Sequence, residues 1–115
     1  MHIQVNLHDA VGGEALSGRV EALVATGLDR FAPHLTRVEV HLGDVNAAKG
    51  GPADKRCMVE ARPNSHQPVS VTHHAATIAL ALDGALDKAR RALDRALAGR
   101  TDHKGAPSVR DNDLR

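Results

Sequence analysis

Four segments of the chain alternate apolar and polar residues with a period of two, which is typical of strands that are buried on one face. They cover residues 2–7, 35–42, 56–62 and 69–72. In the first, Ile3, Val5 and Leu7 are expected to point inward, and in the second Val38, Val40 and Leu42. The last three segments are separated by turn-forming stretches, a long exposed loop over 46–54 and a short turn over 64–67, so we expect antiparallel pairing among them.

Two further segments have helical periodicity. After Gly12 and Gly13, an apolar stripe with spacings of three and four residues predicts a helix that stops before Pro33. Its positions are Leu16, Val20, Leu23, Gly27 and Phe31. A second, longer helix is predicted from about Ala75 to Ala98, with the stripe Ile78, Leu82, Leu86, Ala89, Leu93 and Leu97. Gly18 and Gly27 either weaken the first helix, at about 1 kcal/mol each relative to Ala, or mark close packing on the sheet.

The predicted order β-α-β-β-β-α indicates an α+β fold, in which a four-stranded sheet carries both helices on one face. A chain of 115 residues is long enough for one core, so we expect one domain over residues 1–100. Residues 101–115 combine Gly105 and Pro107 with mixed charges, which predicts a flexible tail. We expect a cytoplasmic protein, because no apolar stretch is long enough for a membrane span or a signal peptide and Cys57 has no second cysteine to pair with.

Composition narrows the chemistry available for recognition. Phe31 is the only aromatic residue among Phe, Trp and Tyr, which excludes binding modes that stack bases on aromatic platforms. The formal net charge is +1, from 15 basic and 14 acidic residues, with eight histidines counted as neutral. A nucleic-acid partner would therefore have to meet a local basic surface, because the molecule as a whole has almost no attracting field.

Charges on the second predicted helix are sorted by sign. Projected at helical spacing, Lys88, Arg91 and Arg95 form a row on one side of the solvent face, and Asp83, Asp87 and Asp94 form a row on the other. One interpretation is a solvated helix with pairs such as Asp87 and Arg91 at i, i+4. The other is that the basic row follows the phosphates of a nucleic acid.

The outward positions of the predicted strands provide a second polar surface. They are His2, Gln4, Asn6, Arg37, His41, Arg56, Arg62, Ser70 and Thr72. An antiparallel sheet with one solvated face has such a surface in any case, so it is compatible with anion binding without specifying the anion.

Catalytic and metal-binding patterns are weak. Cys57, His66, His73 and His74 do not have zinc-ligand spacing, and Cys57 lies in the inward register, where a cysteine behaves as a small apolar residue. Neither a dinucleotide-binding glycine motif nor a phosphate-binding loop is present. We therefore expect no enzymatic activity, no cofactor and no metal.

Residues 1–98 resemble the ribosome hibernation promoting factor family, also described as ribosome-associated inhibitors or sigma-54 modulation proteins. The resemblance is carried by the opening segment 1–6, the strands 37–42, 55–62 and 68–71, and above all the helical run from Ala81 to Leu93. It is a resemblance to the short members, which lack the C-terminal domain by which long members pair ribosomes.

This resemblance implies a fold similar to a double-stranded RNA-binding domain with an extra first strand. It also implies binding to the rRNA of the small ribosomal subunit, in the channel of mRNA and tRNA near the decoding centre, which silences translation under stress and in stationary phase. Neither a membrane nor a small-molecule substrate is expected. Carried over by position, the resemblance implies that Lys88, Arg91 and Arg95 face the rRNA. We also expect Arg90 and the outward strand residues Arg37, Arg56 and Arg62 to bind RNA. The alternative is a non-enzymatic regulator that contacts another cytoplasmic protein through Asp83, Asp87 and Asp94.

Overall fold

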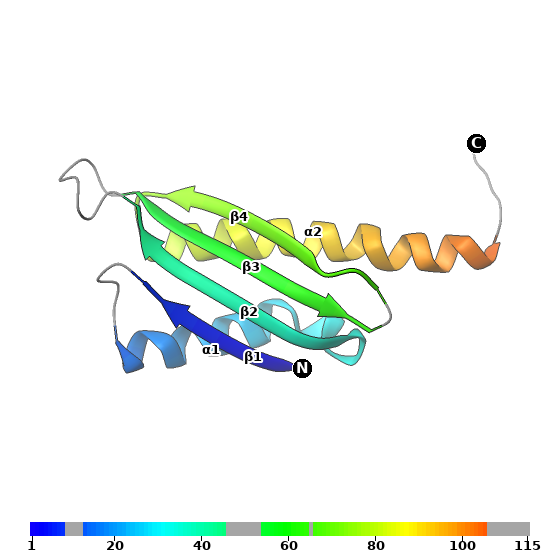
Figure 1. Cartoon of the computed structure of the whole chain (residues 1–115), viewed down its shortest axis with the longest axis horizontal. Coiled ribbons are helices and arrows are strands. Elements are labelled where there is room, and N and C mark those ends of the chain that lie inside the picture. The colour runs from blue at the N-terminus through cyan, green and yellow to red at the C-terminus, as the bar shows by residue number, and fades with distance from the viewer. Residues whose placement is uncertain (9–12, 46–53, 65, 106–115) are drawn as a thin grey trace.

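The protein is described by a computed structural model over residues 1–8, 13–45, 54–64 and 66–105, with side chains described as far as Ala98 (Figure 1). The predicted element order is confirmed, with one short helix added after α1. The elements are β1 (His2–Leu7), α1 (Glu14–Gly27), the 3-10 helix η1 (Asp29–His34), β2 (Leu35–Asp44), β3 (Lys55–Pro63), β4 (Val69–Ala75) and α2 (Ile78–Gly105).

The four strands form one mixed sheet in the order β1-β2-β3-β4. β2, β3 and β4 pair antiparallel, as predicted, whereas β1 and β2 are parallel because α1 and η1 carry the chain back across the sheet between them. One row of cross-strand partners consists of valines alone, namely Val5, Val40, Val59 and Val71. The inward register predicted from the alternation is therefore the observed one.

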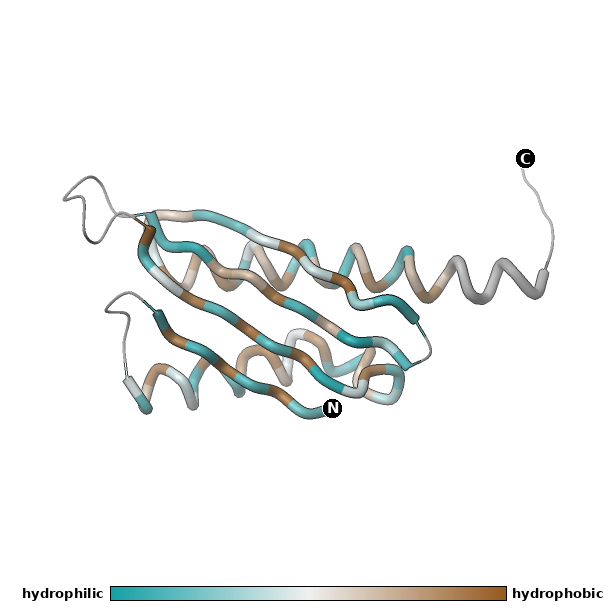
Figure 2. The backbone as a smooth tube through the Cα atoms, viewed as in Figure 1, coloured by the Kyte–Doolittle hydropathy of each residue, from teal (hydrophilic) through white to brown (hydrophobic). Residues whose placement is uncertain are grey.

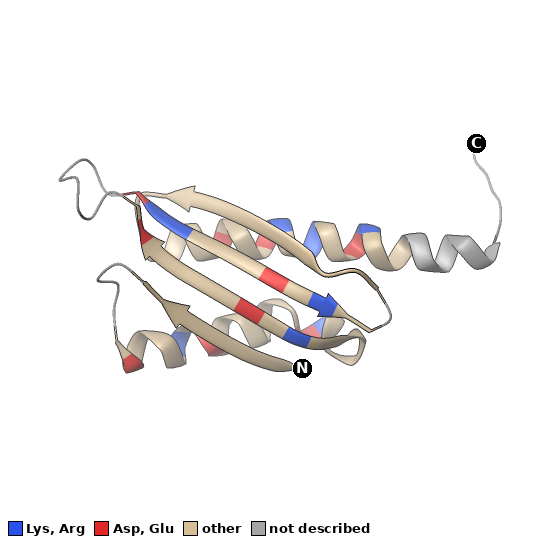
Figure 3. Cartoon of the chain, in the orientation of Figure 1, with Lys and Arg blue, Asp and Glu red and all other residues tan. Residues whose placement is uncertain are grey.

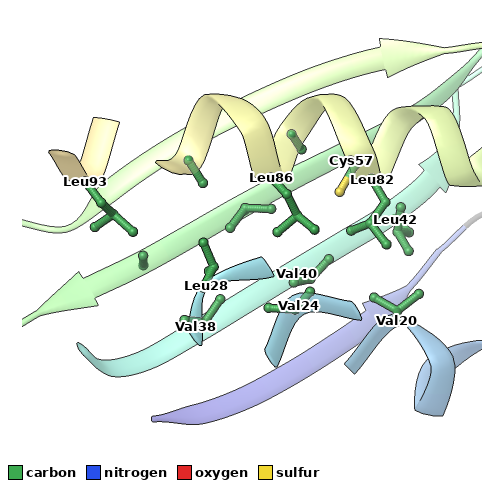
Figure 4. Close-up of a cluster of buried hydrophobic side chains, with 14 of the residues drawn as sticks. Val20, Val24, Leu28, Val38, Val40, Leu42, Cys57, Leu82, Leu86 and Leu93 are labelled. Carbon is green, nitrogen blue, oxygen red and sulfur yellow. The ribbon is translucent and has the colours of Figure 1, made fainter. Parts of the chain in front are cut away.

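Both helices cover the same face of this sheet, with α2 packed on β3 and β4 and α1 on β1 (Figure 1). Apolar and polar residues alternate along each strand, so that one face of the sheet is apolar and the other polar (Figure 2). Side chains from α1, β2, β3 and α2 meet in a single core, as Figure 4 shows for Val24, Val40, Cys57 and Leu86. Within the described residues, no helix combines the length and apolar character needed to cross a lipid bilayer.

The first helix differs from its prediction in length and in its buried stripe. It ends at Gly27, and Phe31 and Pro33 lie in η1, whose tighter turn accommodates a proline that cannot continue an α-helical ladder. Leu23, predicted to face the core, is 54% exposed, whereas Val24 is fully buried. The buried stripe follows Val20, Val24 and Leu28 because α1 packs on β1 and makes little contact with α2.

The second helix begins and ends later than predicted. Ala75 is the last residue of β4, and α2 begins at Ile78. The hydroxyl oxygen of Thr77 accepts a hydrogen bond from the backbone N–H of Leu80 at 3.2 Å, which satisfies one of the free donors of the first turn. The helix continues to Gly105, into the segment predicted as a tail. Residues 106–115 of that tail and 46–53 of the predicted loop lie outside the described residues.

The glycines of the two helices differ in how closely side chains of other elements approach them. An added Cβ at Gly18 would meet nothing within 4 Å, so this glycine weakens α1 without a packing role. At Gly27 it would lie 3.2 Å from Leu86, so the tight contact is with α2 and not with the sheet. At Gly84 it would overlap the imidazole ring of His73, so this glycine leaves the space that the ring occupies between α2 and β4.

Candidate RNA-binding surfaces

The basic residues predicted to bind RNA lie on two opposite sides of the molecule (Figure 3). Four of them, Lys88, Arg90, Arg91 and Arg95, belong to α2 on the helical side. The other three, Arg37, Arg56 and Arg62, lie in the outward register of β2 and β3. The structure therefore does not unite the seven residues in one patch.

Lys88 lies at the open edge of the sheet. Its Nζ donates a hydrogen bond to the backbone carbonyl of Thr72 at 2.9 Å, and Thr72 belongs to the edge strand β4. A lysine at this place covers part of an edge that could otherwise pair with another chain. The basic side of α2 is therefore the side next to β4.

Arg91 and Arg95 extend this side along α2. Arg91 is 69% exposed and lies 2.9 Å from Asp87, which confirms the predicted i, i+4 pair. The side chain of Arg95 is exposed and makes no hydrogen bond or ion pair with the residues that the structure describes. We call Lys88, Arg91 and Arg95 the helical basic row.

Arg90 does not belong to this row. Its Nη1 donates a hydrogen bond to the carbonyl of Gly27 at 3.4 Å, and its Nη2 lies 3.7 Å from Asp87. The carbonyl of Gly27 is at the C-terminus of α1, where the helix dipole favours a cation. Arg90 therefore ties the two helices together, a role that its place in the sequence did not indicate.

The acidic row is largely engaged within the protein. Asp94 accepts two hydrogen bonds from Arg30, both 2.9 Å long, and the guanidinium of Arg30 lies 4.1 Å from the ring centre of Phe31. The hydrogen bonds lower the pKa of Asp94 and raise that of Arg30. Asp87 pairs with Arg91, so Asp83 is the one member of the row without an ion pair among the described residues. Two members of the acidic row are thus paired within the protein, as Arg91 of the helical basic row is, and both remain about half exposed.

On the sheet, the outward basic residues differ in their surroundings. Arg37 donates a hydrogen bond to the side-chain oxygen of Gln4, and its Nε lies 3.0 Å from Glu39. Arg62 is the cross-strand partner of Arg37, and Arg56 lies near the other end of β3. The side chains of Arg56 and Arg62 are exposed and make no described ion pair, so they can reach a ligand at that face without breaking a contact within the described chain.

A cluster of titratable side chains on the outer face escaped the sequence analysis. The ligand atoms of Glu39, His41 and Glu60 all lie within 4.8 Å of one another. His8 stacks on His41, with ring centres 5.7 Å apart. The alternation in β2 places Glu39 and His41 on one face, but only the pairing of β2 with β3 brings in Glu60.

The cysteine and histidines weighed as a zinc site are not assembled into one. Cys57 is buried in the core, and its burial raises the pKa of the thiol to about 12, far from a reactive thiolate. His73 lies opposite Cys57 in the inward register, whereas His74 points to the other face and lies 3.1 Å from Asp54. The structure thus confirms Cys57 as a core residue.

A mixed sheet with two helices on one face and exposed basic side chains on both sides defines the class as an α+β module with candidate anion-binding surfaces. The sequence profile of the family described as sigma 54 modulation protein / S30EA ribosomal protein matches residues 3–100. The chain therefore belongs to this family of ribosome-associated proteins. Among curated proteins, none matches the sequence significantly.

Two solved structures share the fold. A ribosomal subunit interface protein from Coxiella burnetii superposes with a TM-score of 0.66 at 12% identity, over 85% of this chain and 99% of that one. The N-terminal domain of Protein Y from Thermus thermophilus superposes with a TM-score of 0.66 at 21% identity, over 83% of this chain and 98% of that one. At these identities the two structures establish the α+β fold of the described residues.

Proposed function

We propose that this protein binds the rRNA of the small ribosomal subunit near the decoding centre and inhibits translation, as a cytoplasmic hibernation factor without catalytic activity. Membership of a ribosome-associated family over residues 3–100 supports the ribosome as partner. The fold shared with a protein described as a ribosomal subunit interface protein agrees with this.

The observation that carries the RNA-binding part is the helical basic row. Arg91 and Arg95 are exposed on α2 next to Lys88, and Arg95 has no described partner to lose. Guanidinium groups form paired hydrogen bonds with phosphates, and such contacts position a protein on RNA without reading its bases. With Phe31 buried, recognition rests on phosphates, 2′-hydroxyls and shape.

The second basic set, Arg56 and Arg62, fits the same proposal if RNA lies on both sides of the protein. These two residues are on the outer face of the sheet, opposite the layer that contains α2. A single flat RNA surface cannot cover both sets, but a channel with rRNA walls can. A protein seated in such a channel would occupy the space that mRNA and tRNA need.

Co-sedimentation with purified small subunits at increasing salt tests the proposal. We expect the wild type to bind at low salt, with log affinity falling by about 0.9 or less per neutralised phosphate for each unit of log salt concentration. Lys88→Glu/Arg91→Glu/Arg95→Glu should remove most of the binding and of its salt dependence. Arg95→Glu alone should weaken binding without disturbing any described contact.

The matched control is Asp83→Lys, which changes an exposed α2 side chain that has no described ion pair. It should leave binding unchanged or slightly tighter, because Asp83 lies outside the helical basic row. Far-UV circular dichroism confirms that each variant is folded. Wild-type binding by a folded triple Glu variant would contradict the proposed surface, and binding lost in Asp83→Lys alone would favour the protein-contacting alternative.

A further inference from the structure

We propose that Glu39, His41 and Glu60 form a binding site for one divalent transition-metal ion on the outer face of the sheet. Glu60 lies between Arg56 and Arg62 on the outer face of β3, but metal binding at this site can be measured without the ribosome. The site departs from the expectation drawn from the sequence, which weighed only Cys57 and three other histidines as ligands.

Two of the three separations between the ligand atoms are close to those found around a coordinated ion, and all three are within 4.8 Å. His41 Nε2 lies 3.5 Å from Glu39 Oε1 and 3.9 Å from Glu60 Oε1. In a tetrahedral zinc site with bonds of about 2.0–2.1 Å, neighbouring ligand atoms are separated by about 3.3 Å. Small side-chain rotations would therefore bring the three atoms to bonding distance of a shared ion.

Two neighbouring residues, His8 and Arg37, lie against these ligands. His8 Nε2 lies 3.5 Å from His41 Nδ1, so a proton on Nδ1 can be donated to His8 and the lone pair on Nε2 then faces the two carboxylates. The Nε of Arg37 lies 3.0 Å from Oε2 of Glu39, which leaves Oε1 of that carboxylate directed at His41. Metal-binding histidines and carboxylates in proteins are commonly held by such outer partners.

The placement of the two carboxylates is a second, independent reason to propose a cation at this site. Glu39 and Glu60 are direct cross-strand partners, and Figure 3 shows acidic segments side by side in the middle of β2 and β3. Like charges directly opposite each other destabilise a sheet. Among the described residues, the only ion-pair partner of Glu60 is His41, at 3.9 Å. A divalent cation between the carboxylates would remove this repulsion.

The donor set selects the class of metal. One imidazole nitrogen with two carboxylate oxygens suits ions such as Zn²⁺, Co²⁺ or Mn²⁺, whereas Mg²⁺ and Ca²⁺ prefer oxygen ligands alone. The side chains of Glu39, His41 and Glu60 are 24%, 23% and 40% exposed, so an ion can enter from solvent and keep water as its remaining ligand. The site is therefore an open one with three protein ligands.

Titration of the tag-free protein with Zn²⁺ against a chromophoric chelator, and with Co²⁺ by visible absorption, tests the proposal. We expect one equivalent to bind to the wild type. His41→Ala and Glu60→Gln should each weaken binding at least 10-fold, and His8→Ala about 10-fold through loss of the orienting partner. The visible absorption of bound Co²⁺ should have the intensity of a four- or five-coordinate site in the wild type. In His41→Ala this intensity should be lost.

His74→Ala is the matched control, because His74 is another outer-face histidine next to a carboxylate, Asp54 at 3.1 Å, but with no described third ligand. It should bind Zn²⁺ like the wild type. All these changes are outside the core, and circular dichroism verifies folding. The proposal is overturned if the wild type binds no ion, if His41→Ala binds as tightly as the wild type, or if binding is lost in His74→Ala instead.

Discussion

The two faces of the β2–β3 pair have the same strands and register but opposite kinds of cross-strand partners. The inner pairs are Val38 with Ala61, Val40 with Val59, and Leu42 with Cys57, and every member is at most 1% exposed. The outer pairs are Arg37 with Arg62, Glu39 with Glu60, and His41 with Met58. On the inner face partners complement each other in volume, whereas two outer pairs oppose like charges.

The inner pairs stabilise the fold, whereas the outer pairs have a charge arrangement that does not contribute to it in the same way. Burial of the inner pairs provides hydrophobic stabilisation and close packing. The two like-charged pairs are unfavourable to the sheet in themselves, and neighbouring ion pairs such as Arg37 with Glu39 offset part of that cost. This charge arrangement agrees with the two proposals for the outer face, an anion at the arginines and a cation at the carboxylates.

The largest difference in stability between the two faces is expected when neighbouring residues of β2 are replaced by alanine. Leu42→Ala should lower the free energy of unfolding by about 2–5 kcal/mol, because it leaves a cavity in the core. His41→Ala, one position earlier and on the outer face, should change it by no more than about 0.5 kcal/mol. Urea denaturation of both variants measures this, and equal losses would show that the outer face also contributes to stability.

A second prediction concerns the one polar side chain that β4 turns toward the helices, His73. Gly84→Ala should destabilise the protein by about 1–3 kcal/mol, because the new Cβ would overlap the His73 ring. Gly18→Ala is the matched substitution in a helix with open space around it, and it should stabilise the protein by up to about 1 kcal/mol. Thermal unfolding of both variants checks the opposite signs, and a stabilising Gly84→Ala would contradict the close approach of α2 to β4.

Because Glu39 and Glu60 repel each other on the outer face, removing one of the two charges should give a small gain in stability. Glu60→Gln, in the presence of a chelator, should raise the free energy of unfolding by about 0.2–1 kcal/mol, since it removes the charge opposite Glu39. The control is Glu21→Gln on α1, an exposed glutamate without a described ion pair, which should have no effect. A loss of stability in Glu60→Gln would mean that its pairing with His41 outweighs the repulsion.

The smallest effect on stability is expected for the ion pair between Arg30 and Asp94 on the helical side. Hydrogen bonds from Arg30 lower the pKa of Asp94, so its contribution to stability is present above the unfolded value of about 3.9 and is lost as the pH falls through the lower folded value. Asp94→Asn should therefore have a slightly lower Tm than the wild type at neutral pH, and the difference should vanish near pH 2. Asp83→Asn should show no such pH dependence. A Tm difference for Asp94→Asn that persists near pH 2 would assign its effect to packing and not to charge.

Most of the fold was predictable because the information is local. Alternation over a few residues identified all four strands and the inward side of β2, and the apolar stripe identified α2. The errors lie at ends and in the weaker helix. Ala75 belongs to a strand although alanine favours helices, and Leu23 is exposed although it fits the apolar stripe of the first helix. In both cases packing against neighbouring elements overrides the local preference.

The candidate sites divide in the same way. The sequence by itself determined the helical basic row and the i, i+4 pair of Asp87 and Arg91, since one helix fixes the positions of residues three, four and seven apart. Only the tertiary structure decided that Arg90 is turned toward Gly27, that Asp94 is held by Arg30, and that Glu60 lies beside Glu39. These contacts join residues that are far apart in the chain. They are set by strand register and helix packing, and both depend on the whole core and not on any one segment.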